Sequence, residues 1–275
     1  MGTIRSAVIG GITMRWIEEG EGRAVVFIHG VPTGPELWRR VLPQVAGARR
    51  LAWEMVGYAG SIPEGAGRDI SVAGQAGHLL AWLDALGIER AVLVGHDLGG
   101  GVAQIAAMQA PARCAGLVLV NSIAYESWPI PSVRAMRAMG GIVGRLPSAA
   151  FRPVFGGFVR LGHDRRDVAR ESASLHWRPY AAHGGASPFI RQVRSLPTAD
   201  TVAVADELPS LGVPAQIVWG AADRFQDLRY GERLAHDLGA PLVRLDSARH
   251  FVPEDHPEAV ADAVGQVLTA ALSSP

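Results

Sequence analysis

The chain has 275 residues, enough for one large domain or two small ones. Hydrophobic residues make up 48% of it and charged residues 19%, as is typical of a soluble globular protein with a large core. The formal net charge is zero, so neither nucleic acid nor an anionic membrane is expected as a partner on electrostatic grounds.

The lysine and cysteine content excludes Schiff-base catalysis and an internal disulfide. The 26 basic residues are all arginines, so no lysine can form a Schiff base with a substrate. Cys114 is the single cysteine, which excludes an internal disulfide, and its place at the start of an apolar run predicts a buried, inert thiol. The first residues lack the apolar core of a signal peptide, and no apolar stretch is long enough to span a bilayer. We therefore expect a cytoplasmic protein.

The predicted elements alternate along the chain. Residues 6–18 predict a hairpin that turns at two adjacent glycines. Short, continuous apolar runs follow, as expected of strands buried on both faces of a parallel sheet. These runs are 24–28, 51–53, 91–94, 117–120, 215–219 and 242–245. Helical patterns lie between most of them or after the last, at 72–86, 102–110 and 257–272. This order predicts an α/β fold with a mostly parallel sheet flanked by helices.

Residues 125–208 interrupt the alternation, because no strand is recognisable among them. The segment contains prolines, glycines and aromatic residues, with short helical patterns such as 133–139. We therefore expect a mainly helical cap inserted into a core domain formed by residues 1–124 and 209–275. Open α/β sheets bind ligands outside the carboxyl ends of their strands, so this cap should cover the site.

The strand predicted at 91–94 leads into Gly95-His96-Asp97-Leu98-Gly99 and then a helix. This is the arrangement of a nucleophile elbow, with an aspartate in the usual serine position. Gly95 and Gly99 would let the backbone pass closely around a strained central residue. Free N–H groups at the start of the helix would stabilise a carboxylate and, later, an oxyanion. Asp97 could merely cap this helix, but the context favours a nucleophile.

Two later strand ends supply partners for Asp97. Asp223 follows the strand at 215–219, and His250 follows the next strand. The order nucleophile, acid, histidine is the one expected for this kind of site. His256 competes with His250, but it stands directly before a proline at a helix start and is better suited to capping.

A turn follows the strand at 24–28, with the sequence His29-Gly30-Val31-Pro32. Backbone N–H groups after such a turn form one half of an oxyanion hole. We therefore assign the oxyanion hole to the N–H groups of Val31 and Leu98. A simple tight turn is the alternative interpretation.

These motifs resemble the α/β-hydrolase superfamily over nearly the whole chain. The segments 29–32 and 95–100, with Trp38 and the position of the cap, are similar to epoxide hydrolases and haloalkane dehalogenases. One departure lies at 53–61, where the family usually has an aspartate and a Gly-x-Gly-x-Ser turn. The resemblance implies a hydrolase without a cofactor or metal, which acts on a small apolar organic substrate with water as co-substrate.

The resemblance also implies a two-step reaction. Asp97 would attack an sp³ carbon and form an alkyl-enzyme ester. His250, oriented by Asp223, would then activate water to hydrolyse that ester. The possible reactions share these two steps and differ in the group that leaves the attacked carbon.

An epoxide oxygen leaves as an alkoxide and needs an acid, and epoxide hydrolases use cap tyrosines for this purpose. Tyr180 is the first expected donor, although cap packing is an equal alternative, and Tyr125 or His176 would be the second. Haloalkane dehalogenases usually carry asparagine and tryptophan where this chain has Val31 and Leu98. Epoxide hydrolysis to a diol is therefore the favoured prediction.

Two alternatives remain. A haloalkane dehalogenase would need other N–H donors near the cap, such as Trp128 or Trp177. Fluoroacetate dehalogenases use arginines just after the nucleophile, and residues 99–106 contain none. A non-hydrolytic ligand-binding member of the fold is the other alternative, but a complete catalytic set argues against it.

Overall fold

The computed structural model describes residues 2–273. It has an eight-stranded sheet in the order β1-β2-β4-β3-β5-β6-β7-β8. The first pairs, β1 with β2 and β2 with β4, are antiparallel, and the others are parallel. The strands are β1 (Thr3–Ile9), β2 (Ile12–Glu19), β3 (Arg23–Ile28), β4 (Ala48–Glu54), β5 (Ala91–His96), β6 (Cys114–Val120), β7 (Ala215–Gly220) and β8 (Leu242–Leu245). The predicted mostly parallel sheet is confirmed.

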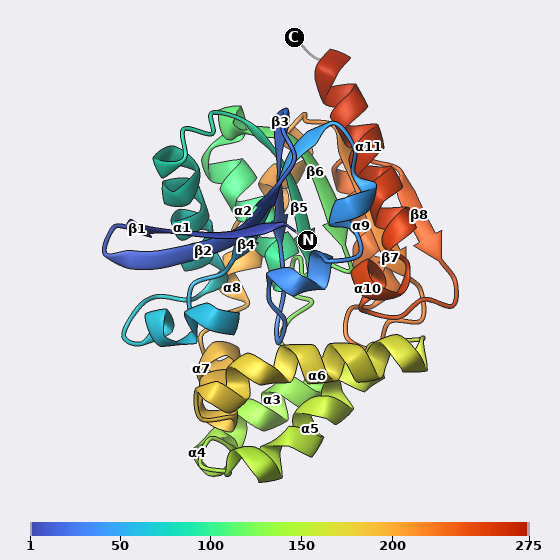
Figure 1. Cartoon of the computed structure of the whole chain (residues 1–275). Coiled ribbons are helices and arrows are strands. Elements are labelled where there is room, and N and C mark those ends of the chain that lie inside the picture. The colour runs from blue at the N-terminus through green and yellow to red at the C-terminus, as the bar shows by residue number, and fades with distance from the viewer. Residues whose placement is uncertain (1, 274–275) are drawn as a thin grey trace.

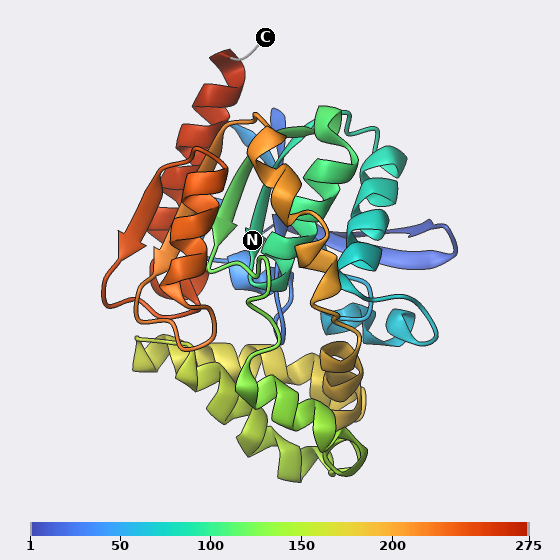
Figure 2. The same ribbon diagram turned by 180° about the vertical axis from the view of Figure 1, so that it is seen from behind.

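Helices cover both faces of this sheet. Figures 1 and 2 show α1, α2 and α9 on one face and α11 on the other. The α-helices of this part are α1 (Val72–Ala85), α2 (Leu98–Gln109), α9 (Leu228–Asp237), α10 (Val252–Asp255) and α11 (Pro257–Ser273). Short 3₁₀ helices are η1 (Pro35–Trp38), η2 (Leu42–Gln44), η3 (Ala59–Gly65), η4 (Pro111–Arg113) and η5 (Ala205–Ser210).

The chain between β6 and β7 is helical. Its α-helices are α3 (Pro131–Ala138), α4 (Gly140–Val143), α5 (Ser148–Leu161), α6 (Arg166–Ala182), α7 (Ala186–Arg194) and α8 (Ala199–Val202). Helices α3 to α7, called the cap helices below, lie across one end of the sheet (Figure 1), whereas α8 packs on α1 and α2. The cap helices therefore cover the carboxyl ends of the parallel strands.

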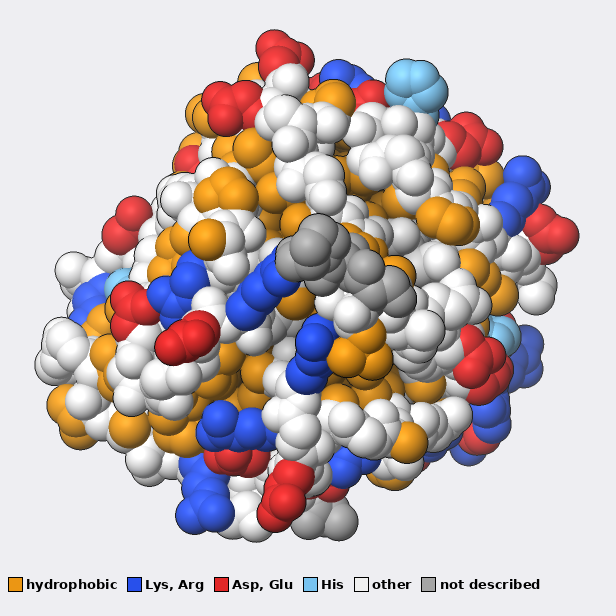
Figure 3. Space-filling model, turned by 90° about the horizontal axis from the view of Figure 1, so that it is seen from above, with side chains coloured by type: hydrophobic (Ala, Val, Ile, Leu, Met, Phe, Trp, Pro, Cys, Tyr) orange, Lys and Arg blue, Asp and Glu red, His pale blue; other side chains and the backbone are white. Residues whose placement is uncertain are grey.

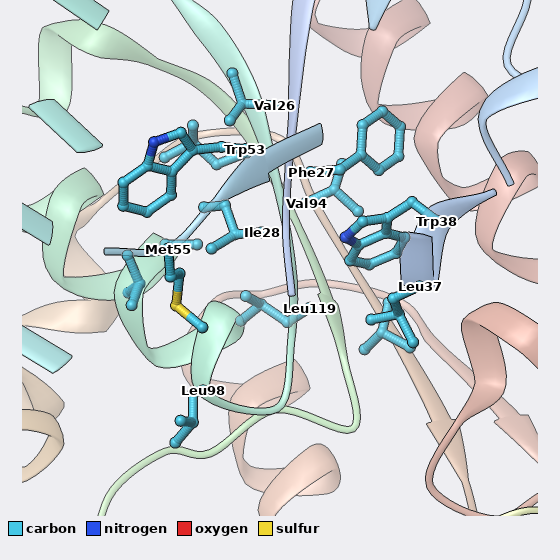
Figure 4. Close-up of a cluster of buried hydrophobic side chains, with 14 of the residues drawn as sticks. Val26, Phe27, Ile28, Leu37, Trp38, Trp53, Met55, Val94, Leu98 and Leu119 are labelled. Carbon is cyan, nitrogen blue, oxygen red and sulfur yellow. The ribbon is translucent and has the colours of Figure 1, made fainter. Parts of the chain in front are cut away.

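Apolar residues on both faces explain why the central strands form. Every residue of β5 and β6 is buried. Figure 4 shows Trp53 and Met55 on one side of β3 and Trp38 with Leu37 on the other. Burying a large apolar side chain contributes roughly 1.5–3 kcal/mol, so this two-sided core fixes the strand order and the positions of the strand ends. Leu98 lies where the strands end, next to this core.

Helix α2 begins at Leu98, directly after Asp97. The apolar pattern of the sequence begins only at residue 102, because the three glycines in between have no apolar side chain. These glycines allow a close approach to the end of β6. A Cβ atom on Gly100 would lie 1.9 Å from Oγ of Ser122. The start of α2 is therefore fixed by packing that the periodicity of the sequence does not reveal.

The face opposite the cap helices carries interspersed acidic and basic side chains, in keeping with the zero net charge (Figure 3). Within residues 2–273, no helix has the length and apolarity needed to cross a bilayer. Cys114 is buried, and its burial raises the pKa of the thiol to about 12. The thiol is therefore protonated and inert at neutral pH, as predicted.

Candidate active site

Asp97 lies at the junction of β5 and α2, with φ of +52° and ψ of −119°. A non-glycine residue in this region of backbone space costs on the order of 1–3 kcal/mol, so the surroundings must hold it there. Its N–H donates to the carbonyl of Val120 (3.3 Å), and its carbonyl accepts from the N–H of Ile123 (3.1 Å). The side chain makes no capping hydrogen bond to α2, so helix capping does not explain this aspartate.

Glycines are required around Asp97. A Cβ atom on Gly99 would lie 2.0 Å from the carbonyl oxygen of Ile28, and one on Gly95 would lie 2.3 Å from the carbonyl oxygen of Gly99. Both distances are far below a normal contact, so no larger residue fits without a backbone shift. The strand, the turn and the helix are thereby packed into one rigid unit.

The Asp97 carboxylate lies against the turn after β3. The N–H of Val31 donates to its Oδ2 at 3.1 Å, and the nearby N–H of Leu98 helps to lower the pKa of the carboxyl. A Cβ atom on Gly30 would lie 2.5 Å from the same Oδ2. Of the two N–H groups assigned to an oxyanion hole from the sequence, that of Val31 is hydrogen-bonded to the carboxylate and that of Leu98 lies beside it.

His29 pins this turn to the neighbouring strand. Its Nε2 accepts from the N–H of Met55 (3.1 Å), so Nδ1 carries the proton and donates to the carbonyl of Gly30 (3.0 Å). Burial lowers the pKa of His29 to about 3, which keeps the ring neutral. The role of His29 is therefore to orient the turn rather than to titrate.

His250 and Asp223 complete the set. Nδ1 of His250 donates to Oδ2 of Asp223 at 2.8 Å, and Nε2 lies 3.9 Å from Oδ1 of Asp97. Asp223 also accepts from Nδ2 of Asn121 (2.6 Å) and from the N–H of Phe225 (2.7 Å). The structure thus brings together the three residues expected from chain order, with Nε2 facing Asp97.

Burial and the neighbouring charges shift the pKa values of Asp97 and His250. Burial raises the pKa of Asp97 to about 6, against the lowering effects of His250 and of the N–H groups of Leu98 and Val31. Burial lowers the pKa of His250, but the charge and hydrogen bond of Asp223 and the charge of Asp97 raise it above its ordinary value overall. A buried carboxylate that ionises near pH 6 is poorly solvated and reactive at neutral pH.

Two supporting residues were not assigned these roles from the sequence. Asn121, directly after β6, accepts from the N–H of Gly220 (3.1 Å), which fixes its amide so that Nδ2 faces Asp223. It could have been found by the rule that identified Asp223, because it is a polar residue at a strand end. Nε2 of His96 donates to the backbone carbonyl of His250 (2.9 Å), and their rings lie 4.6 Å apart. His96 therefore positions the backbone that carries His250.

The two tyrosines expected as donors lie in different surroundings. The buried hydroxyl of Tyr180, on α6, donates to Oε1 of Gln192 on α7 at 2.6 Å. The hydroxyl of Tyr125 donates to Asp237 on α9 at 2.8 Å, and its ring lies under the guanidinium of Arg233. This hydroxyl is paired with α9, so Tyr125 is not available as a donor to the site.

The other expected cap residues differ in their availability. His176 lies 3.3 Å from Oε1 of the buried Glu254, which makes it part of a contact between the cap helices and α10 rather than a free donor. Trp177 packs among phenylalanines inside the cap. Nε1 of Trp128 is buried and has no hydrogen-bond partner among the described residues. Only Trp128 of these three therefore retains an unpaired buried N–H group.

The candidate site is enclosed. Asp97 and His250 are each 2% exposed. A cavity of about 140 Å³ lies nearby, between the turn at 32–34 and α6, with Ala59 and Tyr180 in its walls, and neither Asp97 nor His250 lines it. Among residues 2–273, no cluster of three or more His, Cys, Asp or Glu side chains could hold a metal ion.

Comparisons with known proteins agree with this fold. The model of the alpha/beta hydrolase fold family matches residues 23–257. A haloalkane dehalogenase of Mesorhizobium japonicum is 27% identical over 94% of this chain and 88% of its own length. An alpha/beta hydrolase fold protein from Burkholderia ambifaria superposes with a TM-score of 0.83 at 27% identity, covering 94% of this chain and 96% of that chain. The epoxide hydrolase CorEH superposes with a TM-score of 0.75 over 98% of this chain and 99% of that chain, at 19% identity.

Proposed function

Because this chain belongs to the alpha/beta hydrolase fold family, we propose that it is a hydrolase that uses Asp97 as its nucleophile and forms an alkyl-enzyme ester. The observation that carries the proposal is the position of one carboxylate. Oδ2 of Asp97 accepts the N–H of Val31, while Oδ1 lies 3.9 Å from Nε2 of His250. A carboxylate at the apex of an elbow, between an oxyanion hole and a histidine, is placed to attack carbon.

The first step follows from this geometry. Oδ1 attacks an sp³ carbon, the bond to the leaving group breaks, and its electron pair departs with the leaving group. Oδ2, held by the N–H groups, becomes the carbonyl oxygen of the ester. His250 is not needed as a base here, because Asp97 with a pKa of about 6 is already largely ionised at neutral pH.

The second step uses His250. Nε2 takes a proton from a water molecule, which attacks the Cγ atom of the Asp97 ester. The N–H groups of Val31 and Leu98 stabilise the oxyanion that forms on Oδ2, and removing one such donor typically costs about 10²–10³-fold in rate. Asp223 keeps the proton of neutral His250 on Nδ1 and stabilises the imidazolium that forms when Nε2 takes a proton from water.

We further propose an epoxide as the substrate, opened to a diol. The side chains of Val31 and Leu98 supply no N–H donors for a halide. Tyrosine hydroxyls are suited to protonate an alkoxide, and Tyr180 lies in the wall of the small cavity between the core and the cap helices.

A haloalkane dehalogenase is the second candidate. A departing halide needs N–H donors and no proton, and the buried Nε1 of Trp128, which has no hydrogen-bond partner among the described residues, is the cap N–H group that this candidate would use. The similarity to a haloalkane dehalogenase over 94% of this chain supports the same alternative.

The variant His250→Gln tests both candidates in one experiment. It is expected to complete the first step and stall, because nothing activates water for the ester. Mass spectrometry of the protein, incubated separately with styrene oxide and with 1-bromobutane, should detect an adduct on the peptide that contains Asp97.

The mass of that adduct identifies the reaction. An epoxide adds its whole mass to the enzyme, whereas a haloalkane adds its mass less that of the hydrogen halide. The control variant His250→Gln with Asp97→Ala should carry no adduct. An unmodified Asp97 peptide with both probes would exclude the proposed nucleophile or the role of His250.

A further inference from the structure

Tyr58 lies beside the turn that holds the nucleophile. It follows β4 and immediately precedes η3, at the carboxyl edge of the sheet. Its N–H donates to the carbonyl of Met55 (3.1 Å), and its carbonyl accepts from the N–H of Ser61 (2.8 Å). Its ring is fully buried and packs edge-on to His29, with ring centroids 5.8 Å apart. His29 orients the turn that carries Val31, so Tyr58 packs directly on a residue that supports the candidate site.

The hydroxyl of Tyr58 has no partner among the described protein atoms, although it is completely buried. The other three tyrosines are paired: Tyr125 with Asp237, Tyr180 with Gln192 and Tyr230 with Arg229. Burying an unpaired hydroxyl is costly, and a native structure rarely does so without a reason. A substrate oxygen bound at the site would supply the missing partner.

The electrostatic neighbours of Tyr58 come from both sides of the site. Burial raises the pKa of the hydroxyl well above its ordinary value, and Tyr180 and Asp97 raise it further. The hydroxyl is therefore within the electrostatic influence of the nucleophile on the core side and of Tyr180 on the cap side. It keeps its proton at neutral pH and is available as a donor.

Tyr180, the donor expected from the sequence, is less available. Its proton is directed to Oε1 of Gln192 at 2.6 Å. Nε2 of the same amide donates to the carbonyl of Gly57 (2.8 Å), which fixes the amide orientation so that its oxygen must face Tyr180. Gln192 therefore accepts the hydrogen bond that the Tyr180 hydroxyl can donate. The same side chain also links α7 to Gly57, the residue before Tyr58.

We propose that Tyr58 is the catalytic acid that protonates the leaving epoxide oxygen, a role that rests on the proposed function. As Oδ1 of Asp97 bonds to carbon, the carbon–oxygen bond of the ring breaks and its electron pair remains on oxygen. That oxygen takes the proton of Tyr58 and leaves a tyrosinate. Hydrolysis of the ester by water then returns Asp97 as a carboxylate and releases one proton, which restores Tyr58.

The test compares three tyrosine variants in the His250→Gln parent, in which the ester accumulates. The measurement is the pre-steady-state rate of ester formation on Asp97 with styrene oxide. Tyr58→Phe should slow it by about 10²–10⁴-fold, the usual contribution of general acid catalysis. This loss should exceed that of Tyr180→Phe by at least tenfold, and Tyr230→Phe, on α9, should match the parent.

Thermal unfolding distinguishes lost chemistry from lost structure. Tyr58→Phe removes an unpaired hydroxyl, so it should unfold at the parent temperature or above. Tyr180→Phe leaves the buried oxygen of Gln192 without its donor and should unfold at a lower temperature. A pattern in which Tyr58→Phe is the less active but not the less stable variant cannot come from a merely structural role.

Two results would overturn the assignment, and they are distinguishable. If the parent forms the ester and Tyr58→Phe forms it equally fast, or if Tyr180→Phe shows the larger loss, Tyr58 is not the acid and the proposed function stands. If the parent forms no ester with styrene oxide, the epoxide reaction itself is wrong and this role is excluded with it.

Discussion

Asp97 combines three properties that a structural aspartate does not need. Its φ of +52° is strained, the residue is 2% exposed, and its carboxylate accepts from the N–H group of Val31. Burial disfavours the charged form, while the N–H groups and His250 favour it, and the pKa settles at about 6. The proposed nucleophile is therefore ionised but weakly solvated at neutral pH.

This balance predicts the pH dependence of the first step. Below about pH 6 Asp97 becomes protonated and cannot attack carbon, so ester formation should fall roughly tenfold per pH unit. His250 lowers the pKa of Asp97, so in His250→Gln the fall should begin at a higher pH. Rapid-quench measurements of the ester from pH 5 to pH 8 check both expectations. A rate that stays constant down to pH 5 would contradict the role of Asp97.

At the level of elements, the site depends on the contact between the turn after β3 and the elbow after β5. Gly30 lies so close to Asp97 that a Cβ atom would stand 2.5 Å from both its Cβ and its Oδ2. The two strands pair in parallel, with Ile28 opposite Gly95, so each strand end fixes the position of the other. The register of these two strands therefore sets the position of the proposed oxyanion hole relative to Asp97.

Gly30→Ala should consequently damage catalysis more than folding. The added methyl group displaces the Asp97 carboxylate, and a misplacement of about 1 Å can cost about 10²-fold in rate. Ester formation is expected to fall by at least this factor, while circular dichroism still shows a folded protein. Gly77→Ala, at an exposed position of α1 with open space around it, is the control and should be as active as the parent. Equal rates for the two variants would contradict the proposed contact.

A second contact between elements fastens the cap helices to the core. Glu254 on α10 is completely buried, and Arg39, His163 and His176 are its ion-pair partners. His163 also lies 2.9 Å from Asp255. Burial lowers the pKa of His163, but its hydrogen bonds and charge interactions with these carboxylates raise it overall to about 9. A protonated histidine between two carboxylates thus joins the cap helices to α10.

This contact predicts how stability changes with pH. The pKa of His163 is higher in the folded protein, so the folded state holds the proton more tightly from pH 6.5 to about 9. The stabilisation is complete below pH 6.5 and is lost as the pH rises through 9. It should amount to about 1.5–3 kcal/mol, the contribution of hydrogen bonds to charged groups.

Urea unfolding at several pH values between 6.5 and 9 measures this effect. His163→Gln should flatten the decline in the free energy of unfolding over that interval. His183→Gln, at an exposed position at the end of α6, should retain the decline. A parent protein whose stability is constant over this interval would contradict the proposed charge of His163.

Across the whole molecule, the sequence predicts best what depends on local pattern. The run at 117–120 lies within β6, because a strand in which every residue is buried is marked by its own continuous apolar residues. The positions of Asp97, Asp223 and His250 were predictable, since each follows a strand and the carboxyl ends of parallel strands meet at one edge.

What depends on distant packing could not be predicted. The hydroxyl of Tyr125 turns to Asp237 because α9, over a hundred positions later in the chain, offers a carboxylate there. The sequence of α7 predicts an amphipathic helix, but it does not reveal that the Gln192 side chain forms hydrogen bonds with both Tyr180 and Gly57. Tyr58 lies in the segment where the chain departs from the family pattern, and only its burial without a partner reveals it.

The proposed mechanism requires that an oxygen of Asp97, and not water, attacks the substrate carbon. A single turnover in oxygen-18 water, with enzyme in excess over styrene oxide or 1-bromobutane, tests this directly for either leaving group. Water attacks Cγ of the ester, so the peptide containing Asp97 should gain the heavy isotope and the alcohol product should carry none. A labelled product with an unlabelled Asp97 would mean direct attack by water, with Asp97 acting as a base, and would contradict the account.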